Sequence, residues 1–246
     1  MLVAAALPGI PEVGPGDDLA RLLAAAGSLA DGDVLVVAHK VVSKAEGRVV
    51  ALDDVRPGER AVALGTEHGK DPRLIEVILG ESAQVVRSRP GVLICRTHHG
   101  FVCANAGVDA SNAPAAGFVV LLPRDPDASA RALRARLREL TGVGPAIVVA
   151  DSFGRAWRIG QCDVALGIAG LAAVEDWRGR HDARGRPLDA TIVAIADEAA
   201  AAADLVRRKD SREPAVQIRG LERHVSDVDG PGAAALVRAR DEDLFL

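Results

Sequence analysis

The chain has 246 residues, of which 49% are hydrophobic and only 2% aromatic, and its formal net charge is -4. This length fits one large domain or two small ones, and it supplies enough apolar side chains for a substantial core. The scarcity of aromatic rings argues against a platform that stacks single-stranded nucleic acid, and the lack of a basic excess argues against non-specific nucleic-acid binding.

In the N-terminal half, residues 17–26 are expected to form a helix, because Asp17 can cap its start and leucines recur on one face. A helix is also expected from Pro72, because Asp71 can act as its N-cap and an apolar stripe follows. Residues 34–38 are expected to form a buried strand that runs into residues 39–44. Three short strands follow, at residues 83–87, 92–95 and 101–103.

In the C-terminal half, the expected strands are residues 119–122, 146–150, 191–196 and 215–218. An amphipathic helix is expected over residues 127–140, and an Ala-rich helix over residues 199–206, preceded by Asp197 and Glu198. Residues 178–187 are expected to form a long exposed loop, and the tail from residue 229 a turn and one weak helix. Helices and strands mix without a regular βαβ rhythm, which favours an α+β fold.

The cysteines and the N-terminus indicate a cytoplasmic protein. Cys95, Cys103 and Cys162 lack metal-ligand spacing, and a chain of this size does not need disulfides. Residues 1–7 are apolar but carry no basic flank, and no apolar run reaches membrane-spanning length. We therefore expect association with neither membrane nor nucleic acid.

Several apparent motifs have simpler explanations. Residues 65–71 are one residue short of the Walker spacing, so we interpret them as a turn leading to a capped helix. Residues 167–170 lack the third glycine of a dinucleotide fingerprint, which favours close packing. Ser152 is not in a Gly-x-Ser-x-Gly elbow, and the adjacent His98 and His99 are interpreted as ordinary loop or edge residues.

Asp109 and Asp151 each open a polar run that directly follows a strand-like stretch. Asp109 is followed by Ser111 and Asn112, a set of oxygen donors that suits Mg²⁺ or Mn²⁺ but also suits a simple Asx-turn. Asp151 is followed by Ser152, an arrangement that can present a metal at a sheet edge.

Nearby cations leave two alternatives open. Arg155 and Arg158 can neutralise phosphate or carboxylate, or they can pair with surface acids such as Asp163 and Asp176. Lys44 can likewise bind phosphate or remain solvated. Spacing alone leaves these alternatives balanced.

Several long segments, taken in order, resemble the coenzyme F420-0:L-glutamate ligase family. They are residues 7–12, 40–48, 106–112, 151–161, 196–198 with the Ala-rich helix that follows, and 214–220. The resemblance extends from about the first ten residues to the end of the chain.

The resemblance implies a GTP-dependent γ-glutamyl ligase of the cytoplasm. GTP would phosphorylate the lactyl carboxylate of the deazaflavin precursor coenzyme F420-0, and the amine of L-glutamate would then displace phosphate; further rounds would extend the γ-linked tail. Mg²⁺ or Mn²⁺ is implied, with K⁺ as an additional candidate ion. The alternatives are a ligase of the same build for another carboxylate acceptor, or a nucleotide- or deazaflavin-binding protein without ligase activity.

The implied fold is an unusual α+β ligase fold with mixed sheets, two intimately packed subdomains and an intertwined homodimer. We expect a single ligase domain over residues 1–246, with an internal subdomain near residues 85–150. Some relatives continue into a C-terminal flavin-binding, reductase-like domain, whereas this chain ends near Phe245. A stand-alone ligase domain without that second activity is therefore expected.

Carried over residue by residue, the resemblance assigns the metal ligands to Asp109, Asp151 and Ser152. The expected GTP contacts are Ile10, Pro11, Glu12, Val13, His39, Lys44 and Asn112. As catalytic residues we expect Arg155 and Arg158, binding phosphate or carboxylate.

Two positions depart from the family pattern. His39 stands where many relatives carry Ser or Thr. Lys209 lies near the place of a second-metal ligand in some relatives, and a protonated lysine cannot ligate a metal. The number of metals therefore stays open.

Overall fold

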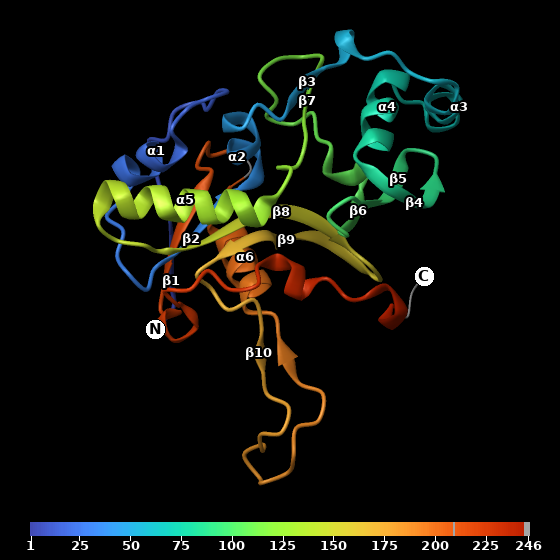
Figure 1. Ribbon diagram of the computed structural model, residues 1–246. Coiled ribbons are helices and arrows are strands. Elements are labelled where there is room, and N and C mark those ends of the chain that lie inside the picture. The colour runs from blue at the N-terminus through green and yellow to red at the C-terminus, as the bar shows by residue number, and fades with distance from the viewer. Residues whose placement is uncertain (209, 244–246) are drawn as a thin grey trace.

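A mixed five-stranded sheet forms the centre of the computed structural model, which describes residues 1–208 and 210–243 (Figure 1). Its strands, in spatial order, are β1 (Val3–Ala6), β12 (Ala215–Arg219), β2 (Val34–Ala38), β8 (Ala146–Arg155) and β9 (Arg158–Ala169). Only β2 and β8 pair in parallel; the other neighbours are antiparallel. The mixed sheets and the helices packed on them confirm the α+β class.

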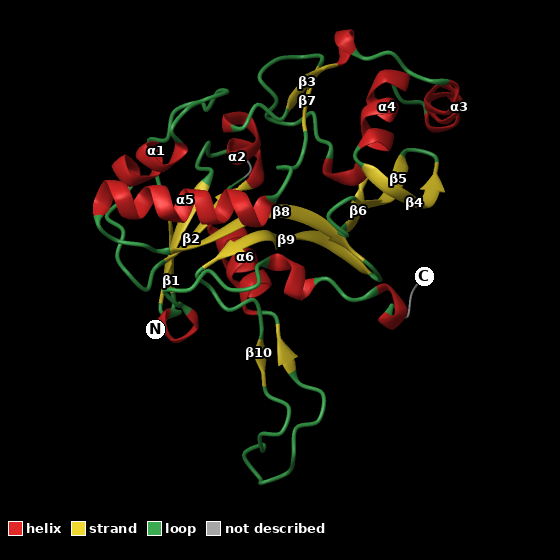
Figure 2. Cartoon of the chain, viewed as in Figure 1, coloured by secondary structure: helices red, strands yellow, loops and turns green. Residues whose placement is uncertain are grey.

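Helices cover both faces of this sheet (Figure 2). On one face lie α1 (Leu19–Ala26), α2 (His39–Ala45) and α5 (Pro126–Thr141), packed on Leu35, Val37, Ile147 and Val149. On the other lies α6 (Ile195–Val206), whose alanines contact Val34, Val36 and Val148. Because side chains alternate along a strand, burial of both faces explains why β2 and the first half of β8 are continuous apolar runs.

A smaller unit packs beside the main sheet and has a buried core of its own. It consists of α3 (Glu59–His68), α4 (Pro72–Gly80), the sheet β4 (Ser82–Arg89), β5 (Val92–Thr97), β6 (Val102–Ala104) and the turn η2 (Asn105–Gly107). Ile75, Ile78 and Leu93 lie at the centre of that core. The pair β3 (Val49–Ala51) and β7 (Phe118–Val120) connects this unit to the rest, after the short turn η1 (Leu52–Asp54).

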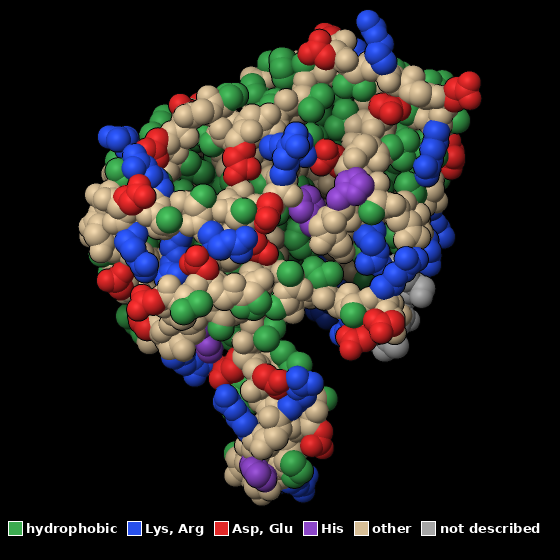
Figure 3. All heavy atoms as spheres, in the orientation of Figure 1, with side chains coloured by type: hydrophobic (Ala, Val, Ile, Leu, Met, Phe, Trp, Pro, Cys, Tyr) green, Lys and Arg blue, Asp and Glu red, His purple; other side chains and the backbone are tan. Residues whose placement is uncertain are grey.

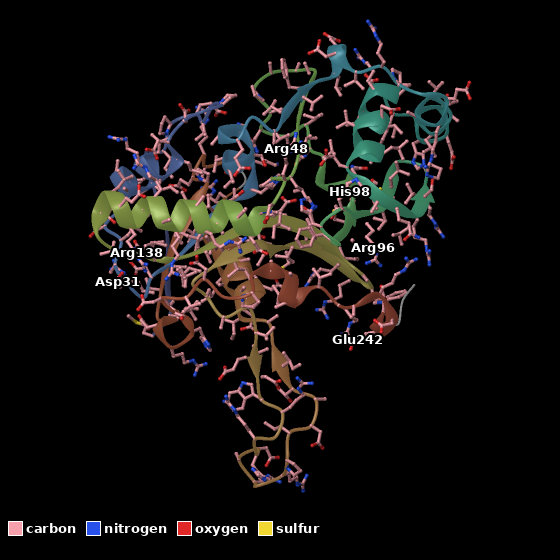
Figure 4. All side chains as sticks on the ribbon, viewed as in Figure 1. Asp31, Arg48, Arg96, His98, Arg138 and Glu242 are labelled. Atoms are coloured by element: carbon pink, nitrogen blue, oxygen red, sulfur yellow. The ribbon has the colours of Figure 1, made fainter. Side chains whose placement is uncertain are left out.

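Arg48 ties the two parts together at this connection (Figure 4). Its Nε donates to the carbonyl of Leu122 at 3.0 Å, and its Nη2 donates to Glu81 Oε2 at 2.7 Å. The guanidinium therefore joins the start of β3 to the beginning of the small unit's sheet.

The predicted exposed loop at residues 178–187 is confirmed as the end of an arm that projects away from the sheet (Figure 1). Its base is the pairing of β10 (Glu175–Asp176) with β11 (Ile192–Val193). The C-terminal tail consists of the short turns η3 (Glu222–His224), η4 (Ala233–Leu236) and η5 (Arg240–Glu242), and it passes β9 on its way to the small unit. Within residues 1–208 and 210–243, the helices are too short or too polar to cross a bilayer.

Three predicted boundaries are wrong. The cap of α1 is Asp18, which accepts a hydrogen bond from the Arg21 amide at 3.1 Å, while Asp17 accepts one from the Gly14 amide. The strand expected over residues 191–196 ends at Val193 because α6 already begins at Ile195. β8 continues past Asp151 to Arg155, because polar residues there pair with β9 instead of entering a loop.

The interpretation of residues 167–170 as close packing is confirmed. That of residues 65–71 is confirmed only for residues 69–71, because residues 65–68 form the end of α3. Gly69, at a φ of 61°, terminates α3, and Asp71 caps α4 by accepting the Arg73 amide at 2.8 Å. Gly167 lies in β9 against the start of α5, where an added Cβ would meet the Pro126 carbonyl oxygen at 2.0 Å. Residues 69–71 therefore end one helix and start the next, and Gly167 allows α5 to pack closely on β9.

The close approach at Gly167 predicts that Gly167→Ala destabilises the protein by about 1–3 kcal/mol, because a methyl group there forces α5 away from β9. Urea denaturation measures this change. The matched control is Gly80→Ala, where an added Cβ meets nothing within 4 Å. Equal stability of the two variants would contradict the packing role.

Candidate functional site

The sheet topology brings the two carboxylates near the start of α2. Ala38 at the end of β2 pairs in parallel register with Ala150 of β8, so the next residues, His39 and Asp151, lie beside each other. The chain after β6 adds Asp109, whose backbone is fixed by reciprocal hydrogen bonds with Val120 at 3.1 and 2.8 Å. These elements enclose what we call the acidic cavity, lined by Lys40, Asp109, Ser111, Asp151, Ser152 and Gln161 among others.

Asp109 is held by an ammonium group and by its own turn. Lys40 Nζ donates to Asp109 Oδ2 and to Ser111 Oγ, both at 2.6 Å. The Ser111 amide donates to Asp109 Oδ1 at 2.7 Å, which is the Asx-turn geometry considered from the sequence. Burial acts to raise the pKa of Asp109, but Lys40 and Ser111 outweigh it and hold that pKa below its ordinary value. Asp109 therefore both forms the Asx-turn and lines the acidic cavity.

Asp151 is the more buried carboxylate, with a side chain 19% exposed, and His39 lies beside it. His39 Nε2 is 3.4 Å from Asp151 Oδ1 and makes no hydrogen bond with the described residues. Burial acts to raise the pKa of Asp151, yet the His39 imidazole, the Ser152 amide and Lys40 together lower it. An anionic Asp151 is therefore favoured at neutral pH.

The Cys103 thiol, which also lines the acidic cavity, is unsuited to nucleophilic chemistry. Burial, followed by the nearby Asp151 carboxylate, raises its pKa to about 12. At neutral pH the group stays a protonated thiol, which is a weak nucleophile and a weak metal ligand.

Ser152 belongs to a buried polar network on the opposite face of β8. Its hydroxyl donates to Asp163 Oδ1 at 2.5 Å, and Asp163 also accepts from Arg207 at the end of α6. The Asp163 side chain is 0% exposed and that of Arg207 is 10% exposed. The Ser152 hydroxyl proton is therefore directed to Asp163.

The residues expected to contact GTP lie in three places. Ile10 and Val13 are buried in the core beneath α1, whereas Glu12 is exposed and forms an ion pair with the buried Lys44. His39 contacts Asp151 as described. Asn112 lies in an exposed turn at a φ of 55°. None of the seven expected GTP contacts is among the described residues that line the acidic cavity.

Arg155 and Arg158 lie at the exposed tip of the β8–β9 hairpin. Arg155 Nη2 donates to the Ile159 carbonyl at 2.9 Å, which closes the hairpin turn. The acids considered as alternative partners, Asp163 and Asp176, pair instead with Arg207 and Arg178. The two arginines thus border the acidic cavity from beyond Gly154 without lining it.

The donor set of the acidic cavity fits a hard divalent cation. Asp109, Asp151 and Ser152 offer oxygen atoms, as Mg²⁺ and Mn²⁺ prefer, and such ions keep water or phosphate as their remaining ligands. No group of three or more His, Cys, Asp and Glu side chains suited to a metal occurs within the described part of the chain. The fit therefore rests mainly on the two carboxylates, with Ser152 as a further residue of the cavity lining. Lys209 falls outside the described residues.

Charge is otherwise mixed around this region. Figure 3 shows Lys and Arg side chains interspersed with Asp and Glu over the visible face, without a continuous block of one sign. The positive charge nearest the two carboxylates comes from Lys40, whose Nζ lies 2.6 Å from Asp109 Oδ2. Lys40 therefore supplies the local neutralisation.

We predict that Lys40→Ala raises the pKa of Asp109, because it removes the charge and the hydrogen bond that lower it. Carboxyl ¹³C chemical shifts followed against pH measure the change. A carboxyl with a depressed folded-state pKa stabilises the fold above its unfolded pKa, about 3.9, and loses that contribution as pH falls through its folded pKa. In Lys40→Ala the pH at which the Asp109 contribution to stability is lost should therefore be higher than in the parent protein. An unchanged Asp109 titration would contradict the pairing.

Two site residues, Lys40 and Asp163, were not singled out for a role from the sequence. Lys40 opens the segment of residues 40–48 that carries the family resemblance, so it could have been identified there. Asp163 was considered only as a surface acid. Strand alternation from Ser152 across the hairpin would have been needed to place it on the same face.

Comparison with known proteins gives consistent matches. Residues 9–220 match the family described as F420-0:Gamma-glutamyl ligase. A "Coenzyme F420:L-glutamate ligase" of Methanopyrus kandleri is 48% identical over 236 residues, covering 95% of this chain and 93% of the relative. Proteins of the same name from Methanothermobacter thermautotrophicus and Haloarcula marismortui are 44% and 43% identical, covering 96% and 97% of this chain and 96% and 93% of the relatives. The chain therefore belongs to the F420-0:Gamma-glutamyl ligase family.

Proposed function

We propose that the chain joins L-glutamate to coenzyme F420-0 in a reaction driven by GTP, and extends the product with further γ-linked glutamates. The observation that carries the proposal is the acidic cavity, which Asp109, Asp151 and Ser152 line together with Lys40. The names of the relatives support the substrates, coenzyme F420 and glutamate.

The chemistry divides into two substitutions. A carboxylate oxygen of the acceptor attacks the γ-phosphorus of GTP, which releases GDP and leaves an acyl phosphate. The amine nitrogen of glutamate then attacks the acyl carbon, the amide bond forms, and inorganic phosphate and a proton leave. Such transfers depend chiefly on alignment and charge neutralisation, which fixed charges in a cavity supply.

The residues present divide this work. Asp109 and Asp151, together with Ser152, would hold Mg²⁺ or Mn²⁺, which when bound neutralises phosphate charge; K⁺ is an additional candidate ion. Lys40 would release its hydrogen bond to Asp109 and donate to a phosphate oxygen instead. His39, Lys44 and Asn112, with the segment at residues 10–13, would hold the nucleotide, and Lys44 would exchange its ion pair with the exposed Glu12 for a phosphate oxygen. Arg155 and Arg158 would bind phosphate or carboxylate from the hairpin tip.

Incubation with GTP, Mn²⁺, L-glutamate and F420-0, followed by mass spectrometry, tests the proposal. The expected result is addition of single glutamyl units together with equimolar GDP, lost when EDTA is added. ATP in place of GTP tests the nucleotide preference. Absence of any glutamyl addition to authentic F420-0 would refute the ligase function.

The same assay separates the alternatives. GTP or deazaflavin binding without glutamate-dependent GDP release would indicate a binding protein, and glutamylation of a different carboxylate acceptor would indicate a ligase of the same build. We further propose a homodimer located in the cytoplasm. Light scattering during size-exclusion chromatography measures the mass of the assembly.

A further inference from the structure

A second cavity lies beside the first, at the outer edge of β9. Its walls come from the small unit, the β8–β9 hairpin and the C-terminal tail, which approach one another on this side of the molecule (Figure 1). Phe101, Val102, Phe153, Val164, Leu236 and Val237 supply apolar surface. We call this space the aromatic cavity.

The aromatic cavity gathers a residue type that the chain otherwise hardly uses. The sequence has four Phe, two Trp and no Tyr. Two of those phenylalanines, Phe101 and Phe153, meet here edge to face at 6.3 Å, and the His99 ring stacks on Phe101 at 5.6 Å. Apolar and aromatic walls with a few polar groups are typical of pockets that bind a planar ring.

Charged groups at the margin can both donate and accept hydrogen bonds. Arg96, on β5, and Arg238, on the tail, offer N–H donors, and Asp197 and Asp243 offer carboxylate oxygens. Arg96 Nη2 lies 3.4 Å from Asp243 Oδ2, while its buried Nε has no hydrogen-bond partner among the described residues. Figure 4 labels Arg96 on the small unit and Glu242 on the tail, the two sides of this margin. The rim therefore suits a ring whose edge carries both carbonyl and N–H groups.

Phe153 lies between the two cavities, because it lines both of them. It lies two residues beyond Asp151 on β8, a separation of about 7 Å along a strand. A ligand whose carboxylate lies in the acidic cavity must therefore pass Phe153 to reach the aromatic cavity. The occupant must be long, with its ring remote from the reacting carboxylate.

We propose that the aromatic cavity binds the deazaflavin ring of the acceptor, against the Phe101 and Phe153 pair, while the acceptor's carboxylate occupies the acidic cavity. This inference rests on the proposed function. L-glutamate is the competing occupant, since two arginines and two acids could hold its charges. It has no aromatic surface to contact the walls, however, and its amine must reach the acyl carbon in the other cavity.

Fluorescence titration of the full chain with F420-0, and with the deazaflavin riboside that lacks the phospholactyl tail, tests the inference. Stacking contributes enough that Phe101→Leu should weaken binding of both probes by about tenfold or more. Arg238→Gln, at an exposed position that tolerates replacement, should weaken binding independently of any effect on the core. Phe118→Leu, at the other described phenylalanine position outside the cavity, is the matched control and should bind as the parent does.

Steady-state kinetics complete the test. Phe101→Leu and Arg238→Gln should raise KM for F420-0 and leave KM for GTP and glutamate unchanged. Unchanged riboside binding in both variants, or a rise in KM for glutamate alone, would overturn the inference. Ring binding without glutamyl addition would refute the ligase function but support the ring site. Glutamyl addition with unaltered F420-0 kinetics in both variants would support the ligase function but refute the ring site.

Discussion

Replacing Asp151 with Asn is expected to lower glutamyl transfer by at least about 10²–10³-fold, the scale of losing one electrostatic contact to a charged transition state. The amide keeps the shape of the carboxylate but removes its charge beside His39 and Lys40. Asp109→Asn should have an effect of the same order, because both carboxylates line the acidic cavity. The mass-spectrometric assay measures the rate, and metal titration calorimetry should show weakened Mn²⁺ binding.

Asp176→Asn provides the control for those variants. Asp176 forms an exposed pair with Arg178 on the projecting arm, and its replacement should leave turnover unchanged. Circular dichroism should show the parent's fold in all three proteins. Turnover by Asp151→Asn or Asp109→Asn at the parent's rate would remove that residue from the proposed metal site.

Asp163→Ala is expected to destabilise the protein by about 3–5 kcal/mol, because it removes the carboxylate that pairs with the buried Arg207 guanidinium. The substitution also removes the acceptor of the Ser152 hydroxyl proton. Urea denaturation monitored by circular dichroism gives the change in unfolding free energy. Glutamyl transfer should fall as well, since the Ser152 hydroxyl loses the Asp163 acceptor.

Two further variants separate charge from shape at this position. Asp163→Asn keeps an oxygen that can accept from Ser152 and should therefore be less harmful to turnover than Asp163→Ala. Asp176→Ala breaks only an exposed pair, and about 0–1 kcal/mol is expected. A loss at Asp163→Ala no larger than that of Asp176→Ala would contradict the buried network.

Much of the fold could be predicted because local signals and burial agree. The strand at residues 34–38 is apolar on both faces, and the Asp71–Pro72 start of α4 combines a cap with a proline that needs no amide partner. The tip of the β8–β9 hairpin was not recognised as strand, because alternating polar residues and glycines there also suit a loop. Its pairing with β9 is a tertiary contact that no local pattern reveals.

The sequence predicted which residues belong to the candidate site better than it predicted how they are placed relative to one another. Family resemblance named Asp109, Asp151 and Ser152, and the fold brings all three to one cavity. Their partners are placed by strand register. Ala38 lies opposite Ala150, which brings His39 and Lys40 towards Asp151, and Ser152 lies opposite Asp163. Register depends on pairing between segments more than a hundred residues apart in the case of β2 and β8, which a single sequence does not disclose.

The β8 strand between Ala150 and Gly154 has a further consequence for how this family can vary. Asp151 and Phe153 lie on one side of the pleat and Ser152 on the other, where Asp163 is its cross-strand partner. Single substitutions alter one group at a time, but an insertion or deletion of one residue would exchange the two sides together, and Ser152 would face the space that Asp151 occupies. The length of this segment is therefore constrained more tightly than its composition, and natural length changes should accumulate instead at the hairpin tip and in the projecting arm.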